Sequence, residues 1–326
     1  MSGINSPLKF KNVMKKIIIV SMGLLLSSAI IFTSCKKTNN DNPGTTEDVT
    51  ESKVQSDDQA SVSNGMDEMS TDASTSVENV MAVTGGNLLN HFLSPCNSTI
   101  TYDTLNAVRT ITITYNGLNC AGTRNRTGSI TVSIPAGDKW KNAGAQLTIS
   151  YNTIKITRVS DNKSITINGS EVITNVTGGL LYQLPTLGTI THTITSSGMS
   201  ITFDDGTQRT WQVAKQRVFT YNNGLVISTT GTHTDGAITG ISEWGTNRLG
   251  NAFVTAIIDP LVIRQDCNFR LTSGRVKHSK LLRQVDVTFG LDAAGNPTSC
   301  PGTGAYYMKI IWTNAAGVSV TVILPY

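Results

Sequence analysis

The sequence predicts an all-β protein, an antiparallel up-and-down meander of about fifteen strands that follows a disordered N-terminal tether. The composition is the first observation, because threonine occurs at 45 positions while charged residues make up 15% and aromatic residues 6% of the 326 residues. Such a mixture favours short, half-buried strands over amphipathic helices. The second observation is an alternation of apolar and hydroxyl side chains after Cys96, and the third is a set of turn dipeptides that interrupt it.

The alternation is plainest over residues 110–115, 129–134 and 146–151, where Ile, Val, Leu and Tyr alternate with Thr and Ser. One apolar face and one hydroxyl face are typical of antiparallel strands with a single buried side. Five turn dipeptides supply the positive φ of tight hairpins, namely Asn116-Gly117, Asn168-Gly169, Asp205-Gly206, Asn223-Gly224 and Asp235-Gly236. Further runs cover residues 153–159, 163–175, 189–195, 199–203, 208–222, 225–230, 237–244, 251–258, 261–277, 283–290, 305–313 and 318–324. An elongated curved sheet, an open barrel and a sandwich all fit this periodicity.

Residues 14–34 have the features of a lipoprotein signal peptide. Lys15 and Lys16 precede a mainly apolar stretch from Ile17 to Phe32, and Thr33-Ser34-Cys35 follows it. A basic segment, an apolar segment and a small residue before Cys predict cleavage before Cys35 and acylation of its thiol. The apolar stretch has 16 residues, which is short of the roughly 20 that a transmembrane helix needs. Met14 begins a complete signal, so we expect residues 1–13 to be an upstream start extension.

Acylation of Cys35 predicts a protein that is attached to a membrane by lipid alone. Lys36 and Lys37 follow without an acidic residue, which favours the outer membrane over retention in the inner membrane. The periplasmic side and the cell surface are both open as the location of the domain.

Residues 35–85 are expected to be a lipidated disordered linker and residues 86–326 the all-β domain. Residues 36–85 hold 10 acidic and 3 basic side chains and few apolar ones, so they cannot bury enough apolar surface to offset chain entropy. A flexible spacer of about 48 residues would hold its ends about 35–40 Å apart. Residues 86–326 hold 19 basic and 12 acidic side chains, so the linker is net negative and the domain net positive.

Four cysteines accompany Cys35, and an even number in an exported chain predicts two disulfides with three possible connectivities. Cys96 and Cys120 flank one predicted hairpin, and Cys267 and Cys300 flank another. A hairpin that folds at its middle brings its flanking residues together, so we expect the local pairs Cys96–Cys120 and Cys267–Cys300. A zinc site is the rival interpretation, but the sequence has no Cys-x-x-Cys pair and its histidines lie elsewhere.

Five segments carry a resemblance to a known family. They are the Thr33-Ser34-Cys35 motif, residues 115–120 followed by 124–130, residues 244–251, residues 260–263, and the segment from Cys267 to Cys300. As a set they resemble the uncharacterised, often paralogous lipoproteins of Bacteroidetes bacteria, over most of residues 96–326. The chain departs from that family at Pro301, where an acidic residue commonly follows the last cysteine. The resemblance implies an envelope location and an all-β fold, and it adds no catalytic residue.

We predict no catalytic residue, no metal site and no cofactor. The four histidines are dispersed, and His192 alternates in phase with Ile190 and Ile194, which places it on an apolar face. Asp204-Asp205-Gly206 invites comparison with the carboxylate pair of glycoside hydrolases, but adjacent strand residues point apart and Asp-Gly is typical of a turn. Nucleophile elbows, phosphate-binding glycine loops and the His-Glu-x-x-His motif are absent from the sequence.

The strand over residues 211–221 presents a candidate ligand face. Alternation places Trp211, Lys215, Arg217, Phe219 and Tyr221 on one side. Aromatic rings mixed with cations suit stacking on sugar rings and binding of an anionic polysaccharide. The alternative is an ordinary strand in which the Lys and Arg stems lie along the aromatic rings.

We therefore expect a cell-envelope lipoprotein whose domain binds or scaffolds without catalysis, with a glycan or another envelope component as its partner and no nucleic acid. The alternative function is a hydrophobic-ligand carrier with an open curved sheet that holds an acyl chain, and a hydrolase is the third hypothesis. Whether the apolar face is covered or left as an open groove distinguishes the first two. Asp103-Thr104-Leu105 resembles the O-glycan acceptor triplet of exported proteins in these bacteria, so Thr104 is a candidate O-glycosylation site.

Overall fold

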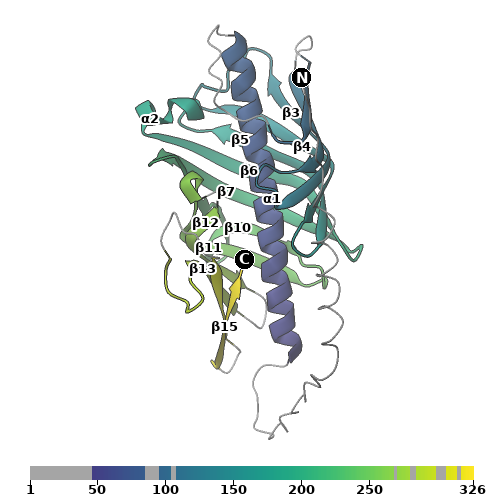
Figure 1. The fold of residues 1–326 in the computed structure, drawn as a ribbon, viewed down its shortest axis with the longest axis vertical. Helices are drawn as coiled ribbons and strands as arrows, with labels where there is room; N and C mark the ends of the chain where they lie inside the picture. The colour runs from purple at the N-terminus through teal and green to yellow at the C-terminus, as the bar shows by residue number, and fades with distance from the viewer. Residues whose placement is uncertain are drawn as a thin grey trace, which may run out of the picture. The chain divides into compact units, whose positions relative to one another are not determined.

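A sheet of fifteen antiparallel strands dominates the computed structural model, and its strands curve around one long helix (Figure 1). The structure describes residues 46–84, 95–103, 108–267, 270–279, 284–298, 306–313 and 317–326. All of them belong to one unit, Pro43–Tyr326. The prediction of an all-β meander of about fifteen strands is confirmed.

The helices are α1 (Thr46–Thr84), the 3-10 helices η1 (Leu181–Gln183) and η2 (Gln265–Cys267), and the single turn α2 (Leu184–Leu187). The strands are β1 (Ser98–Asp103), β2 (Val108–Leu118), β3 (Arg124–Pro135), β4 (Ala145–Arg158), β5 (Ser164–Asn175), β6 (Thr189–Phe203), β7 (Gln208–Tyr221), β8 (Leu225–Gly231), β9 (His233–Asp235), β10 (Ile238–Thr246), β11 (Ala252–Arg264), β12 (Arg270–Ser279), β13 (Gln284–Leu291), β14 (Tyr307–Thr313) and β15 (Ser319–Pro325).

The strands follow chain order across the sheet from β1 to β7 and from β10 to β15, as an up-and-down meander requires. The departure lies at β8, which pairs with both β7 and β11, and at β9, which pairs with β10. The first half of β7 pairs with β10 and its second half with β8, so β8 and β10 fill the space between the long strands β7 and β11. Among the described residues β1 and β15 are the two ends of the path, and the observed arrangement is therefore an open curved sheet.

The turn dipeptides behave in two ways. Asn223 and Gly224 have φ of 53° and 138° and form the β7–β8 turn, as predicted. Asn168-Gly169 instead lies inside β5, where the register with β6 shifts. A Cβ on Gly169 would lie 2.6 Å from the carbonyl oxygen of Gly198, so this glycine permits a close approach of two strands at a bulge.

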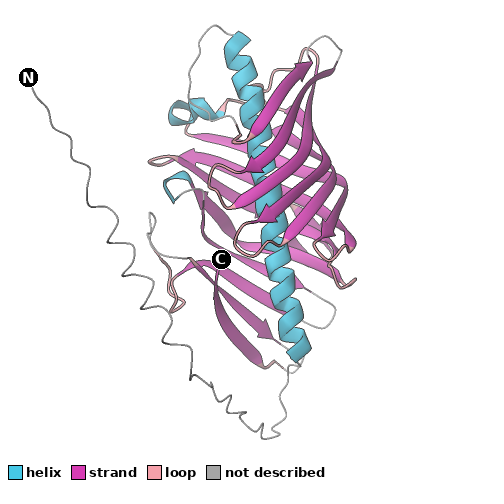
Figure 2. Cartoon of the chain, turned by 45° about the vertical axis from the view of Figure 1, so that its right-hand side comes forward, coloured by secondary structure: helices cyan, strands magenta, loops and turns pink. Residues whose placement is uncertain are grey.

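The predicted disordered linker over residues 35–85 is wrong for residues 46–84, which form the 39-residue helix α1. Figure 2 shows α1 passing along the inner side of the curved sheet. The sequence has few apolar residues in this segment, but the sheet presents charged side chains that pair with its polar ones. The boundary at residue 86 also fails, because α1 shares a hydrophobic core with the sheet. Residues 36–45 lie outside the described part of the chain.

The apolar side chains of α1 form one stripe at helical spacing, namely Val62, Met66, Met69, Ala73 and Val77, each at most 3% exposed. They pack into the same core as the inward residues of β2 to β7. Gly65 lies beside this stripe, and a Cβ there would meet Cδ1 of Ile156 at 2.7 Å. The missing side chain thus allows the helix to lie close against the sheet.

Two smaller cores complete the unit. One is formed by the inward residues of β11 to β14, among them Val276, Val287 and Ile310. The other lies at η1 and α2, where Leu181 and Leu184 pack on Ile190 and Phe219.

The predicted pair Cys96–Cys120 is confirmed as a disulfide, with 5.2 Å between the Cα atoms. It joins the residues just before β1 and just after β2. Cys267 is also disulfide-bonded, and its expected partner Cys300 lies outside the described residues.

Candidate functional site

The face of β7 that the sequence singled out is buried against α1. Trp211, Lys215, Arg217 and Phe219 do share one side of the strand, and each is at most 4% exposed. Tyr221, at the end of β7, is 56% exposed. The structure thus brings four of the five predicted residues together. It places the helix α1 against them, which the sequence did not predict.

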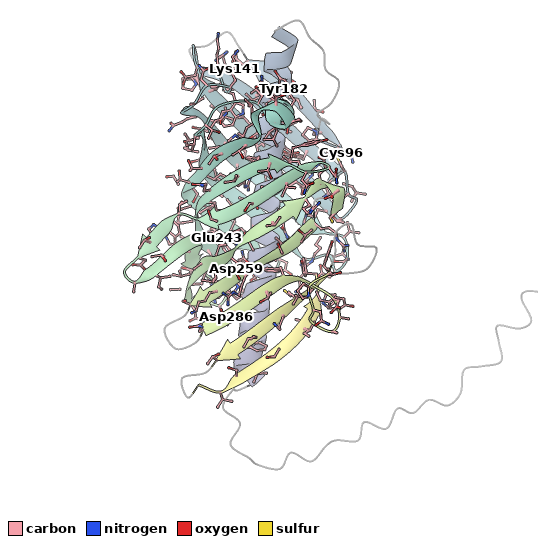
Figure 3. All side chains as sticks on the ribbon, turned by 90° about the vertical axis from the view of Figure 1, so that its left-hand side faces the viewer. Cys96, Lys141, Tyr182, Glu243, Asp259 and Asp286 are labelled. Atoms are coloured by element: carbon pink, nitrogen blue, oxygen red, sulfur yellow. A yellow bond between two sulfur atoms is a disulfide. The ribbon has the colours of Figure 1, made fainter. Side chains whose placement is uncertain are left out.

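Lys215 and Arg217 form the first of three cation clusters that face α1. Lys215 Nζ lies 2.6 Å from Glu243 on β10 and 3.7 Å from Asp67 on α1. Arg217 pairs with the same Asp67. In Figure 3, which views the sheet from its other side, α1 passes behind the strand that carries Glu243. Burial lowers the pKa of Lys215, but Asp67 and Glu243 more than offset it, so the net pKa is raised and the ammonium stays charged.

A second cation cluster lies on β3. The guanidinium of Arg126, 1% exposed, lies 3.0 Å from Glu68 and 2.9 Å from Asp72, both on α1. The Tyr115 hydroxyl donates to Asp72 at 3.0 Å, and the Arg126 guanidinium stacks over the Tyr115 ring. Burial raises the pKa of Asp72 to about 7 despite the attraction of Arg126.

A third cluster faces the N-terminal half of α1. Arg158 lies 2.7 Å and Lys163 lies 3.1 Å from Asp57. Arg248, in the turn after β10, lies 2.6 Å from Asp58. These cations are more exposed than those of the other two clusters, since 29% of the Arg158 side chain and 48% of the Lys163 side chain are accessible.

A buried carboxyl lies among these cation clusters. Glu171 on β5 accepts hydrogen bonds from the Tyr151 hydroxyl at 2.6 Å and the Ser70 hydroxyl at 3.0 Å. Burial raises the pKa of Glu171 above its ordinary value and raises that of Tyr151 well above 10.0. Ser70 belongs to α1, so the helix completes this polar network.

Ser63, Lys215 and Glu243 have the composition of a nucleophile with a general base. The Ser63 hydroxyl donates to Glu243 and accepts from Lys215 Nζ at 3.1 Å. A lysine can take the serine proton only as the neutral amine, whereas Glu243 and Asp67 hold Lys215 in its charged form. The arrangement is therefore that of a structural ion pair. Within the described residues no group of three or more His, Cys, Asp or Glu side chains could hold a metal ion.

The other residues that the sequence singled out are not among the cations of the three clusters. His192 lies on the apolar face as predicted, with ring contacts to Trp140 and Phe219 at 4.9 and 4.8 Å, and burial lowers its pKa to about 3. Asp205 lies in the turn between β6 and β7, as Asp-Gly predicted. Cys35 and Thr104 lie outside the described residues.

Sequence reasoning missed the whole contribution of α1. Its carboxylates at residues 57, 58, 67, 68 and 72 pair with the three cation clusters. The signal that could have revealed it is the spacing of Val62, Met66, Met69 and Ala73, which is 4, 3 and 4 residues and is typical of one helix face.

The chain matches no protein-family model, no curated protein and no solved structure at a significant level. The site must therefore be interpreted from its own chemistry. No helix in the described ranges is both long and apolar enough to cross a membrane.

Proposed function

We propose that this protein is a lipoprotein of the bacterial outer membrane, anchored through Cys35, whose domain binds an anionic envelope component without catalysis. The signal-like segment before Cys35 and the resemblance to Bacteroidetes lipoproteins support the anchor. The ten residues 36–45 lie between Cys35 and α1. Fully extended, they reach at most about 36 Å, so the domain stays close to the membrane while α1 is docked.

The observation that carries the binding proposal is the row of cations on the inner face of the sheet. Lys215 and Arg217 are 2% and 4% exposed, and Arg126 is 1% exposed. Burying charge is costly unless it is paired, yet the carboxylates Asp67 and Asp72 come from a helix outside the sheet. A sheet that serves only as a scaffold would be more stable with apolar residues here, so the cations indicate a surface for an anionic ligand.

A linear anionic polysaccharide fits this surface. Its regularly spaced carboxylates would replace those of α1, and its sugar rings would meet the aromatic faces of Tyr115 and Trp211. The hydrophobic-ligand carrier is less well supported, because an acyl chain in place of α1 would leave Arg217 and Arg126 without the carboxylates that pair with them.

The test is binding of polygalacturonate to residues 36–326, which lack the signal peptide and the acylated Cys35, with dextran of similar length as the neutral comparison. The double variant Arg158→Gln/Lys163→Gln removes two partly exposed cations that face α1. The control Arg264→Gln/Arg275→Gln removes two cations whose partners are Asp266 and Asp259. We expect polygalacturonate to bind, with an affinity that falls as salt rises, and the first variant to weaken binding at least about fivefold. Equal affinity for dextran, or equal losses in both variants, would contradict the proposal.

A further inference from the structure

The helix α1 has the charge of the ligand that the sheet is proposed to bind. Residues 46–84 hold nine acidic side chains and one lysine, whereas residues 86–326 are net positive. Asp58, Asp67 and Asp72 each lie on a different cation cluster. At 1.5 Å rise per residue they are spaced about 14 and 8 Å along the helix axis. Helix α1 therefore presents carboxylates along its length, on more than one side, to the cation clusters of the sheet that curves around it.

The fit of α1 to the sheet is incomplete. On α1, both polar atoms of the Gln55 amide and the hydroxyl of Ser76 are buried without a hydrogen-bond partner. On the sheet, the same holds for Nε of Arg126, whose guanidinium pairs with Glu68 and Asp72 of α1. Buried polar atoms are normally satisfied, and each exception weakens the packing that contains it. At these atoms the packing of α1 on the sheet is less stable than a fully hydrogen-bonded interface would be.

Helix α1 can also leave without disrupting a strand. Its described hydrogen bonds to the sheet and to η1 run through α1 side chains, as at Ser70 and Asp72 to the sheet and at Glu78 to η1. Ten residues, 85–94, separate it from Pro95, and the Cys96–Cys120 disulfide holds the start of β1 independently of the helix. Isolated polar helices are marginal in water, so a displaced α1 is expected to lose its helical structure.

We propose that α1 is a displaceable gate that mimics the anionic ligand and covers Lys215, Arg217 and Arg126 until ligand replaces it. This proposal rests on the proposed function, since it assigns the regulation of the same site. The ligand it implies is a linear polyanion with anionic groups that match the spacing of Asp58, Asp67 and Asp72.

Gate opening also changes the reach of the domain from the membrane. With α1 docked, residues 36–45 form the connection to Cys35, with a root-mean-square length of about 16–19 Å if they behave as a flexible chain. With α1 released, residues 36–94 form the connection, and the same relation gives about 38–46 Å. Ligand binding would thus move the β domain away from the membrane.

Gly65 provides a way to open the gate without touching a charge. A side chain at this position meets Ile156, Ile165 and Ile167, so Gly65→Leu should prevent α1 from lying against the sheet. The matched control is Asn64→Leu, which adds the same side chain at the neighbouring, half-buried position. A second opening variant, Asp67→Lys/Asp72→Lys, places like charges opposite Arg217 and Arg126.

The experiment measures binding of two probes to residues 36–326 of the wild-type chain and of these variants. The probes are polygalacturonate and a labelled peptide of residues 54–78, which supplies the gate in trans. We expect both opening variants to bind polygalacturonate at least about tenfold more tightly than wild type, and Asn64→Leu to stay within about twofold of it. The peptide should bind the opening variants and not the wild-type protein.

The outcomes separate the gate from the proposed function. Polygalacturonate binding of equal strength in wild type and both opening variants would overturn the gate and leave the function standing. Peptide binding to the opening variants without polygalacturonate binding would support the gate and overturn the anionic polysaccharide as ligand. Failure of both variants to bind the peptide, with strand content by circular dichroism unchanged, would overturn the gate.

Discussion

Glu78, near the C-terminal end of α1, makes the docking of the helix depend on pH. Its carboxyl is 2% exposed, and both oxygens accept the N–H of Leu181, at 2.9 and 3.0 Å. Burial raises its pKa from 4.5 to about 7, against the opposing effect of the Leu181 and Tyr182 backbone. The folded protein therefore binds this proton more tightly than the unfolded chain does.

The sign follows from linkage. A carboxyl with a raised folded-state pKa leaves stability intact below about pH 4.5 and lowers it as the pH rises towards 7. A shift of about 2.5 units corresponds to about 3 kcal/mol. At pH 5 less than about 1 kcal/mol of this cost is present, and at pH 8 nearly all of it is. The Glu78→Gln variant carries no titratable group at this site, so it escapes the cost.

The assay is urea unfolding of wild type and Glu78→Gln at pH 5 and pH 8. The free energy of unfolding of the variant, relative to wild type, should rise by about 2 kcal/mol between the two pH values. Any constant effect of the altered hydrogen bonds cancels in this difference. Asp161→Asn is the control, because Arg158 lowers the pKa of Asp161 to about 2 and its contribution is constant from pH 5 to 8. If the free energy of unfolding of Glu78→Gln relative to wild type is also the same at pH 5 and pH 8, the argument that burial raises the pKa of Glu78 is refuted.

Asp67→Ala should lower the free energy of unfolding by about 3 kcal/mol, because it leaves the buried Arg217 without its partner. Asp259→Ala, which breaks the exposed pair with Arg275, should cost less than about 1 kcal/mol. Urea unfolding compares the two, and equal losses would contradict the burial argument. Non-reducing peptide mapping should find Cys267 linked to Cys300, and a free Cys300 thiol would count against the second hairpin. Cys35→Ala should abolish acylation, and a variant that still enters the detergent phase of a Triton X-114 partition would sink the proposed anchor.

The strands could be predicted because their signal is local. Alternation with a period of two is set by the pleat, and residues 110–115 and 129–134 alternate over their whole length as parts of β2 and β3. The pairing of β7 with β10 along its first half and with β8 along its second half could not be predicted in the same way. It depends on which strand lies beside each half of β7, and sequence periodicity carries no information about that neighbour.

Helix α1 was missed because its stability comes mainly from partners distant in sequence. Asp67 pairs with Arg217, 150 residues later, and Asp72 with Arg126, 54 residues later. Read alone, a polar segment of this composition is typical of disorder. The alternation of β7 did identify the surface that binds the helix, although its Lys215 and Arg217 were expected to face an external ligand.

Native-state hydrogen exchange across α1 and the central strands tests the central claim most directly. The claim is that α1 is docked on the sheet and leaves it without global unfolding. Amides of residues 62–78 should be protected, yet should exchange through an opening of lower free energy than amides of β4 and β5, with the difference at least about 1.4 kcal/mol. Absence of protection in α1 would contradict docking, and opening of α1 and β4 at the same free energy would contradict its independent release.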